Sequence, residues 1–125
     1  MSVISILAKD DAPAIELDSI KKLLKIEGPS FPEDALEIYQ PILKWLAENE
    51  NILDQLECSF DYTILSSASN KVVFELFLRL EKMYNNGKNI SVKWYYSSFD
   101  EDMLDEGRGF KENMKIPFEL IEKQH

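Results

Sequence analysis

The sequence has few of the side chains on which most catalytic sites depend. Among its 125 residues there is one cysteine, Cys58, and one histidine, His125. A single cysteine excludes an intramolecular disulfide. His125 is the last residue, and chain ends are usually frayed, so a Cys–His or Ser–His–Asp arrangement would have no fixed base. Cys58 lies in the apolar run LECSF, which favours a buried small side chain over a nucleophile.

No pair of carboxylates stands out as the acid and base of one cleft. The densest acidic segment, Asp100–Glu106, lacks the ligand spacing and central glycine of a calcium loop. Acidic residues are also common where a helix begins, because they complement the helix dipole. We therefore predict a protein that is not an enzyme, with no catalytic residues, no metal site and no cofactor.

Long apolar runs are missing, and basic residues are scarce. The longest candidate for a membrane span, IYQPILKWLA, is broken by Pro41 and Lys44 and is shorter than the roughly 20 residues required. The first residues have no basic stretch ahead of their short apolar run, unlike a signal peptide. With 14 basic and 23 acidic side chains the net charge is −9, which disfavours binding to nucleic acid or anionic lipid. We expect a cytoplasmic protein with no nucleic-acid partner and no membrane insertion.

The apolar periodicity predicts nine elements. The two prolines at positions 29 and 32 indicate a break in the chain over residues 28–32, and Pro41 is expected to kink or restart the first helix. Pro117 favours an edge position for the last strand. Strands are predicted at Val3–Ala8, Ala14–Asp18, Leu23–Glu27, Leu56–Leu65, Asn89–Tyr96 and Ile116–Glu122, and helices from Glu33, over Ser69–Asn86 and over Asp100–Met114.

The order of these elements, β-β-β-α-β-α-β-α-β, predicts an α/β fold. Strands that alternate with helices imply parallel connections, whereas Ser19–Lys22 is a polar connection of hairpin length between antiparallel strands. The sheet should therefore be mixed, with five to six strands and about three helices. A length of 125 residues, 45% of them hydrophobic, fits a single domain that spans residues 1–125.

The most informative segment is the serine-rich turn between the strand that ends at Leu65 and the helix that follows. Ser66, Ser67 and Ser69 lie where unpaired backbone N–H groups and a partial positive charge gather. Three readings are open at this point. Ser67 or Ser69 could cap the helix, the turn could bind an anion, or a hydroxyl could be phosphorylated and then recognised by another protein.

The order and spacing of several segments resemble a known family. They are Gly28-Pro29-Ser30-Phe31-Pro32-Glu33 before a helix that ends in Lys44-Trp45, the strand and serine turn, Lys71–Tyr84, Asn86-Gly87-Lys88, Ser91–Tyr96, the acidic helix and Ile116-Pro117-Phe118. Together they resemble the SiaC family of bacterial regulatory phosphoproteins. Members of that family are similar in fold to STAS-domain anti-anti-sigma factors, so the resemblance implies a STAS-like fold.

The resemblance implies a partner-switching mechanism. A protein serine/threonine kinase of the histidine-kinase-like ATPase type adds a phosphate in the strand-to-helix turn, and a PP2C-type phosphatase removes it. The unmodified form binds and activates an output protein such as a diguanylate cyclase, which raises cyclic-di-GMP and favours biofilm. The family's phosphorylated residue aligns with Ser67, with Ser66 and Ser69 as alternatives.

The same resemblance implies a partner-binding surface around the turn. Its predicted residues are Leu65, Ser66, Ser67, Ala68, Ser69, Asn70 and Lys71. The alternative function is a domain that binds an anion or another small molecule at the same helix N-terminus. A metal-dependent enzyme that uses the Asp100–Glu106 carboxylates is the third and least favoured hypothesis.

Overall fold

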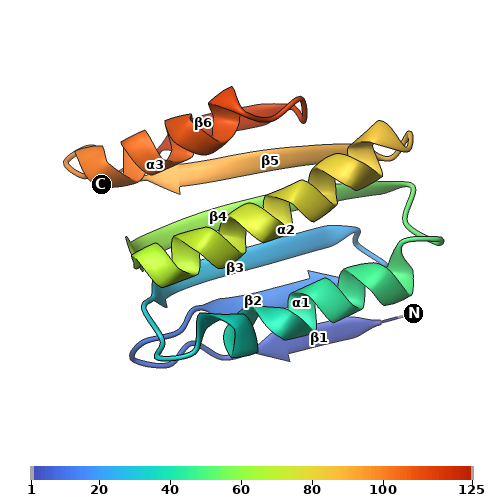
Figure 1. Cartoon of the computed structure of the whole chain (residues 1–125), viewed down its shortest axis with the longest axis horizontal. Coiled ribbons are helices and arrows are strands. Elements are labelled where there is room, and N and C mark those ends of the chain that lie inside the picture. The colour runs from blue at the N-terminus through green and yellow to red at the C-terminus, as the bar shows by residue number, and fades with distance from the viewer. Residues whose placement is uncertain (1, 125) are drawn as a thin grey trace.

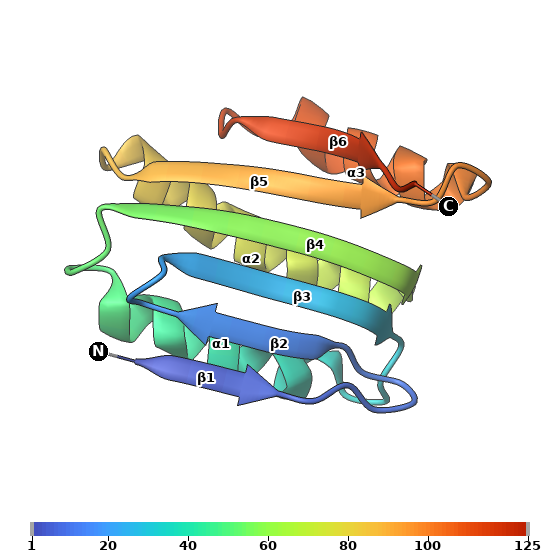
Figure 2. The same cartoon turned by 180° about the vertical axis from the view of Figure 1, so that it is seen from behind.

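A computed structural model describes residues 2–124, and His125 lies outside the described residues. The chain forms one six-stranded sheet with three helices packed on one of its faces (Figures 1 and 2). The elements are β1 (Val3–Ile6), β2 (Ala14–Asp18), β3 (Leu23–Ser30), α1 (Ala35–Asn49), β4 (Gln55–Leu65), α2 (Ser67–Asn85), β5 (Asn89–Tyr96), α3 (Glu101–Glu112) and β6 (Phe118–Glu122). The predicted α/β class and element order are confirmed.

The sheet is mixed, as predicted, and its strand order follows the chain order from β1 to β6. β1–β2 and β2–β3 pair antiparallel, whereas β3–β4, β4–β5 and β5–β6 pair parallel. The last strand, β6, lies at an edge of the sheet, as Pro117 predicted. Each parallel connection passes through one helix, so α1, α2 and α3 all return across the same face (Figure 1).

The two faces of the sheet differ because side chains alternate along each strand. On β4, every second residue from Leu56 to Tyr62 is buried beneath the helices. The residues between them lie on the face without helices, where Glu57 pairs with Lys93 of β5 at 2.6 Å and Asp61 pairs with Lys123 at 3.0 Å. The core is therefore confined to the layer between sheet and helices.

Aromatic rings fill the part of this core that lies under α2 and α3. Trp94 of β5 is buried among Phe60, Phe77, Phe110 and Phe118, with ring centroids 5.5–6.5 Å apart. Its indole N–H donates to the carbonyl of Met103 at 3.0 Å. These contacts fix α3 against the sheet, so the position of that helix is set by the core.

The predicted break at Gly28 and Pro29 does not end the third strand. β3 continues to Ser30, beyond the predicted end at Glu27, because a register shift between Gly28 and Pro29 takes up the irregularity. Gly28 has a φ of 118°, which a glycine adopts without strain. The prediction of a break over residues 28–32 was therefore wrong for its first three positions.

The first helix also differs from its prediction. α1 begins at Ala35 instead of Glu33, because the side chain of Asp34 accepts a hydrogen bond from the Glu37 amide and caps the helix. The helix runs through Pro41 without restarting. A proline at this position takes away the amide that would pair with the Glu37 carbonyl, and Glu37 is an exposed residue.

The remaining boundaries shift by a few residues. α2 begins at Ser67, two residues before the prediction, and α3 covers Glu101–Glu112 with Asp100 as its cap. β1 ends at Ile6 instead of Ala8, and β6 begins at Phe118 instead of Ile116. Between residues 2 and 124 none of the helices has the length and hydropathy of a membrane span.

Candidate functional site

The serine turn lies at the carboxyl end of β4, where the chain enters α2. Ser66 is the residue that caps the helix: its backbone is extended (φ −70°, ψ 162°), and its hydroxyl accepts from the Ser69 amide at 3.1 Å. The Ser66 carbonyl accepts the first helical hydrogen bond, from the Asn70 amide at 2.8 Å. The expectation that Ser67 or Ser69 caps the helix was wrong, because both have already entered it.

Ser69 points into the protein. Its side chain is fully buried, and its hydroxyl oxygen accepts a hydrogen bond from the Ser30 hydroxyl at 2.8 Å. Ser30 lies at the end of β3, and its carbonyl also accepts from the Ser66 amide at 2.9 Å. One residue of β3 therefore holds the turn on both sides of Ser67.

Ser67 is the exposed serine of the three. It occupies the first position of α2, and its hydroxyl has no hydrogen-bond partner among residues 2–124. The neighbouring Ala68 is exposed as well, so no large side chain covers the hydroxyl. Ser66 is half-buried and its oxygen is occupied by the cap, which leaves Ser67 as the accessible hydroxyl of the turn.

A chain of buried hydroxyls continues inward from Ser69. The Ser30 hydroxyl lies 2.7 Å from that of Tyr39 in α1, which lies 2.8 Å from that of Tyr62 in β4. Each hydroxyl has one hydrogen. Because Ser30 donates its hydrogen to Ser69, Tyr39 must donate to Ser30 and Tyr62 to Tyr39. Burial raises the pKa of Tyr39 and, further, that of Tyr62, so both phenols keep these protons at neutral pH.

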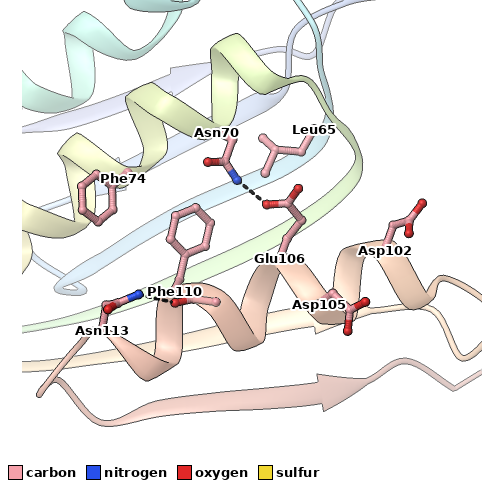
Figure 3. A pocket seen from close by; sticks show the side chains of 9 residues that line it. Leu65, Asn70, Phe74, Asp102, Asp105, Glu106, Phe110 and Asn113 are labelled. Atoms are coloured by element: carbon pink, nitrogen blue, oxygen red, sulfur yellow. Dashed lines mark hydrogen bonds between the residues drawn. The ribbon is translucent and has the colours of Figure 1, made fainter.

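A groove runs beside the turn, between α2 and α3 (Figure 3). It has a volume of about 620 Å³ and begins where Leu65 ends β4. The α2 side of the groove carries one polar and one aromatic side chain, and the α3 side carries three carboxylates and a second aromatic ring. The lining residues are Leu65, Asn70, Phe74, Asp102, Asp105, Glu106, Gly109, Phe110 and Asn113.

Glu106 has the most perturbed carboxylate of this groove. Partial burial and the nearby charge of Asp102 raise its pKa, against a smaller opposite effect of the Asn70 side chain. The Asn70 amide donates to the Glu106 carboxylate across the groove, and this bond joins the first turn of α2 to α3 (Figure 3). Asp105 pairs with Arg108 one helical turn away at 3.5 Å, with both side chains largely exposed.

The described residues hold no group of three or more His, Cys, Asp or Glu side chains arranged to bind a metal ion. Cys58 is fully buried in β4, and burial, assisted by the neighbouring Glu57 charge, raises the pKa of its thiol far above the ordinary value. A thiol in that state is a poor nucleophile. Cys58 is therefore a packing residue.

The predicted partner-binding residues differ in their exposure to solvent. Ser67, Ala68 and Lys71 are exposed, and Ser69 is buried. The other three are half-buried: Leu65, Ser66 and Asn70. Sequence reasoning missed that α3 lies beside this turn and contributes Glu106 and Gly109 to the same concave surface. The Asp100–Glu106 cluster was visible in the sequence, where it suggested either a metal site or charges that complement a helix dipole, and nothing in the sequence placed it beside the serine turn.

Comparison with known proteins decides the family. The family model described as "SiaC family regulatory phosphoprotein" matches residues 6–123, which is nearly the whole chain. The chain belongs to the SiaC family. An uncharacterised protein of Pseudomonas aeruginosa (strain UCBPP-PA14) is 26% identical over 124 residues, covering 96% of each chain. The resemblance drawn from the sequence is thereby confirmed.

Solved structures share the SiaC-family fold. Apo-SiaC from P. aeruginosa is 24% identical, with a TM-score of 0.89 over 97% of this chain and 99% of that one. A chain in the crystal structure of the diguanylate cyclase SiaD in complex with its activator SiaC, also from P. aeruginosa, is 23% identical, with a TM-score of 0.90 over 96% and 99% of the two chains. At these identities the likeness shows that the fold is shared.

Proposed function

We propose that this SiaC-family protein is a non-enzymatic signalling adaptor that is switched by phosphorylation of Ser67. The unmodified protein binds and activates an output protein, for which a diguanylate cyclase is the leading candidate, and so controls cyclic-di-GMP and biofilm. A kinase of the histidine-kinase-like ATPase type adds the phosphate in the cytoplasm, and a PP2C-type phosphatase removes it. The family and the fold shared with SiaC, an activator in its complex with SiaD, support this proposal.

The observation that carries the proposal is the different state of the three serine hydroxyls. Ser66 is occupied as a cap, Ser69 is buried against Ser30, and Ser67 is exposed without a partner. A kinase needs a hydroxyl that can enter its own active site, so access selects Ser67. The bonds from Ser30 to both flanking residues hold the turn in one conformation around it.

A phosphate on Ser67 is compatible with the fold of this chain. It would lie at the N-terminus of α2, where the Ser67 and Ala68 amides have no intrahelical acceptor and the helix dipole favours negative charge. The same phosphate would carry a charge of about −1.5 to −2 into any interface that covers the turn. Desolvating that charge, and its repulsion from acidic groups of a partner, would weaken the complex.

Intact-mass measurement followed by peptide mapping, on protein purified from its own host, tests the proposal. The expected result is an added mass of about 80 Da on the peptide that contains Ser67. Phosphate on Ser66 instead would support the phosphorylation switch and show that Ser66, not Ser67, is the modified residue. If no phosphate is found in any growth phase and a candidate kinase adds none, the anion-binding alternative would gain support, with thermal shifts by inorganic phosphate as its test.

Substitutions at Ser67 test the switch itself. Ser67→Ala should stay folded within about 0.5 kcal/mol of the wild type, because Ser66 provides the cap, and it should activate a candidate cyclase constitutively. Ser67→Glu should lose that activation, measured as cyclic-di-GMP formed per unit time. Asn51→Glu serves as the control, because it adds a similar charge in the exposed turn that follows the end of α1 at Asn49. Equal activation by Ser67→Glu and wild type would contradict the mechanism.

A further inference from the structure

We propose that the groove between α2 and α3 receives an arginine side chain of the partner protein. The inference rests on the proposed function only in taking the occupant to belong to that partner. The groove holds about 620 Å³, enough for a long side chain and part of the backbone that carries it. Its two walls differ in chemistry, and the difference selects the occupant (Figure 3).

One wall carries negative charge that the protein does not neutralise. Asp102 and Glu106 project from α3, and no basic side chain among residues 2–124 forms an ion pair with either of them. The Asn70 amide gives Glu106 a hydrogen bond but no positive charge. A cation that entered the groove would therefore gain two carboxylate partners without first breaking an ion pair.

The other surfaces are apolar and aromatic. Phe74 of α2 is 40% exposed, Phe110 of α3 lies across from it with only 6% of its surface exposed, and Leu65 closes one end. A planar guanidinium stacks on aromatic faces and forms two parallel hydrogen bonds with a carboxylate, whereas an ammonium is a strongly hydrated point charge. The combination of the exposed Phe74 ring and the carboxylates therefore fits arginine better than lysine. It also disfavours a metal ion, which would find ligands on one wall only.

Gly109 lines the groove without contributing a side chain to it. A Cβ added there would meet no atom within 4 Å, and the residue lies in an ordinary stretch of α3. Neither crowding nor an unusual backbone angle explains this glycine, although glycine weakens a helix. The groove therefore has no side chain at this position, between Glu106 and Asn113.

The groove and the phosphorylation turn would be covered by the same partner. Ser67, Asn70 and Phe74 are three and four residues apart along α2 and therefore lie on one face of the helix. A protein segment with its arginine against Asp102 and Glu106 would lie beside the helix face that carries Ser67. The partner-binding surface predicted over residues 65–71 thus extends to α3.

The test is a titration of the ¹⁵N-labelled full chain with N-acetyl-arginine amide, followed by amide chemical shifts. We expect saturable shifts confined to the groove, at Asn70, Phe74, Glu106 and Gly109. N-acetyl-citrulline amide, which has nearly the same shape but no charge, should cause no saturable shift. Shifts spread over the whole acidic surface, or equal shifts with citrulline, would overturn the proposal.

Two variants of Gly109 locate the binding. Gly109→Leu places a side chain on the groove floor and should weaken binding of the arginine amide about tenfold or more. Gly109→Ala adds a methyl group to the same helix position, should leave the affinity within about twofold, and serves as the matched control. Both variants are first checked by circular dichroism. Unchanged affinity of a folded Gly109→Leu would overturn the assignment, as would displacement of the arginine amide by equimolar Mg²⁺.

This experiment is independent of the phosphorylation switch, because neither the kinase nor the cyclase takes part. If arginine binds in the groove but Ser67 is never phosphorylated, the groove stands and the proposed switch fails. If Ser67 is phosphorylated in the host but the amide does not bind, the switch stands and the groove assignment fails.

Discussion

Gly107 and Gly109 lie two residues apart in α3, but their surroundings differ. A Cβ added at Gly107 would lie 2.5 Å from Cδ1 and 2.7 Å from Nε1 of Trp94, and 2.8 Å from a methyl carbon of Leu120. Trp94 is buried and hydrogen-bonded to Met103, so its ring cannot move aside at low cost. Gly107 therefore lets α3 approach the sheet, whereas Gly109 faces open space.

Alanine substitutions should separate these two roles. Gly107→Ala is expected to destabilise the protein by about 1–3 kcal/mol, because the methyl group overpacks the contact with Trp94. Gly109→Ala should stabilise it by about 0.4–1 kcal/mol, because alanine loses less conformational freedom in a helix. Urea unfolding followed by far-UV circular dichroism measures both. Destabilisation of equal size in the two variants would contradict the assigned packing.

Among the structural elements, β3, α1, β4 and α2 meet at the four buried hydroxyls of Ser30, Tyr39, Tyr62 and Ser69. Their hydrogens run in one direction, from Tyr62 through Tyr39 and Ser30 to Ser69. The hydroxyl hydrogens of Tyr62, Tyr39 and Ser30 therefore each have an acceptor, although all four residues are nearly inaccessible to water. Removing the Tyr39 hydroxyl should therefore cost more stability than removing the Tyr62 hydroxyl.

Phenylalanine substitutions test this direction. Tyr39→Phe leaves the buried Tyr62 hydroxyl without an acceptor and should cost about 1–3 kcal/mol of unfolding free energy. Tyr62→Phe removes only the first donor, leaves the other hydrogens paired, and should cost about 0.5–1.5 kcal/mol. Equilibrium unfolding in urea compares the two variants. If the hydrogens ran the other way, each substitution would leave one donor without an acceptor, so a loss for Tyr62→Phe as large as that for Tyr39→Phe would contradict the assigned direction.

Elements with a strict period were predictable from the sequence. The alternation along β4 marked both the strand and its buried face, and the apolar face of α2 marked a helix to within two residues at its start. Gly28 and Pro29 misled the prediction because a register shift lets β3 continue past residues that usually end a strand. Local patterns do not reveal whether neighbouring strands can absorb such an irregularity.

The site was predicted less completely than the fold. The sequence identified the serine turn, but the distinction between Ser67 and Ser69 depends on the hydroxyl of Ser30, 39 residues away from Ser69. The groove depends on Asn70 and Glu106, which are 36 residues apart and meet only when α2 and α3 pack on the same sheet. Such pairs are set by tertiary structure and leave no periodic signal.

At the scale of the whole molecule, charge is unbalanced. The chain carries a net charge of −9, and several ion pairs on the open face of the sheet, such as Lys25–Glu27 at 3.5 Å, are about half exposed. Exposed pairs contribute little to stability, whereas the excess of negative charge opposes the compact state. Repulsion between like charges therefore outweighs the attraction of these pairs.

Added salt should consequently stabilise the protein. Raising NaCl from about 10 mM to about 150 mM shortens the screening length from about 30 Å to about 8 Å, and we expect the melting temperature to rise. Differential scanning calorimetry at pH 7 measures the shift, and KCl serves as the control for ion-specific effects. A fall in melting temperature would show that the ion pairs matter more than the net charge.

The strand order of the sheet, which follows the chain order from β1 to β6, bears on how the chain folds. Every strand pairs only with the strand just before or after it, so no segment has to wait for a distant one before it can add to the sheet. Paired residues such as Leu23 and Glu57, or Val92 and Phe118, are separated by one helix and its connections. Each parallel pairing therefore closes a loop of about one helix and its connections, and none has to span the whole chain. During synthesis, the hairpin-linked strands β1–β3 can form first, and each later helix and strand can then add to an edge that already exists.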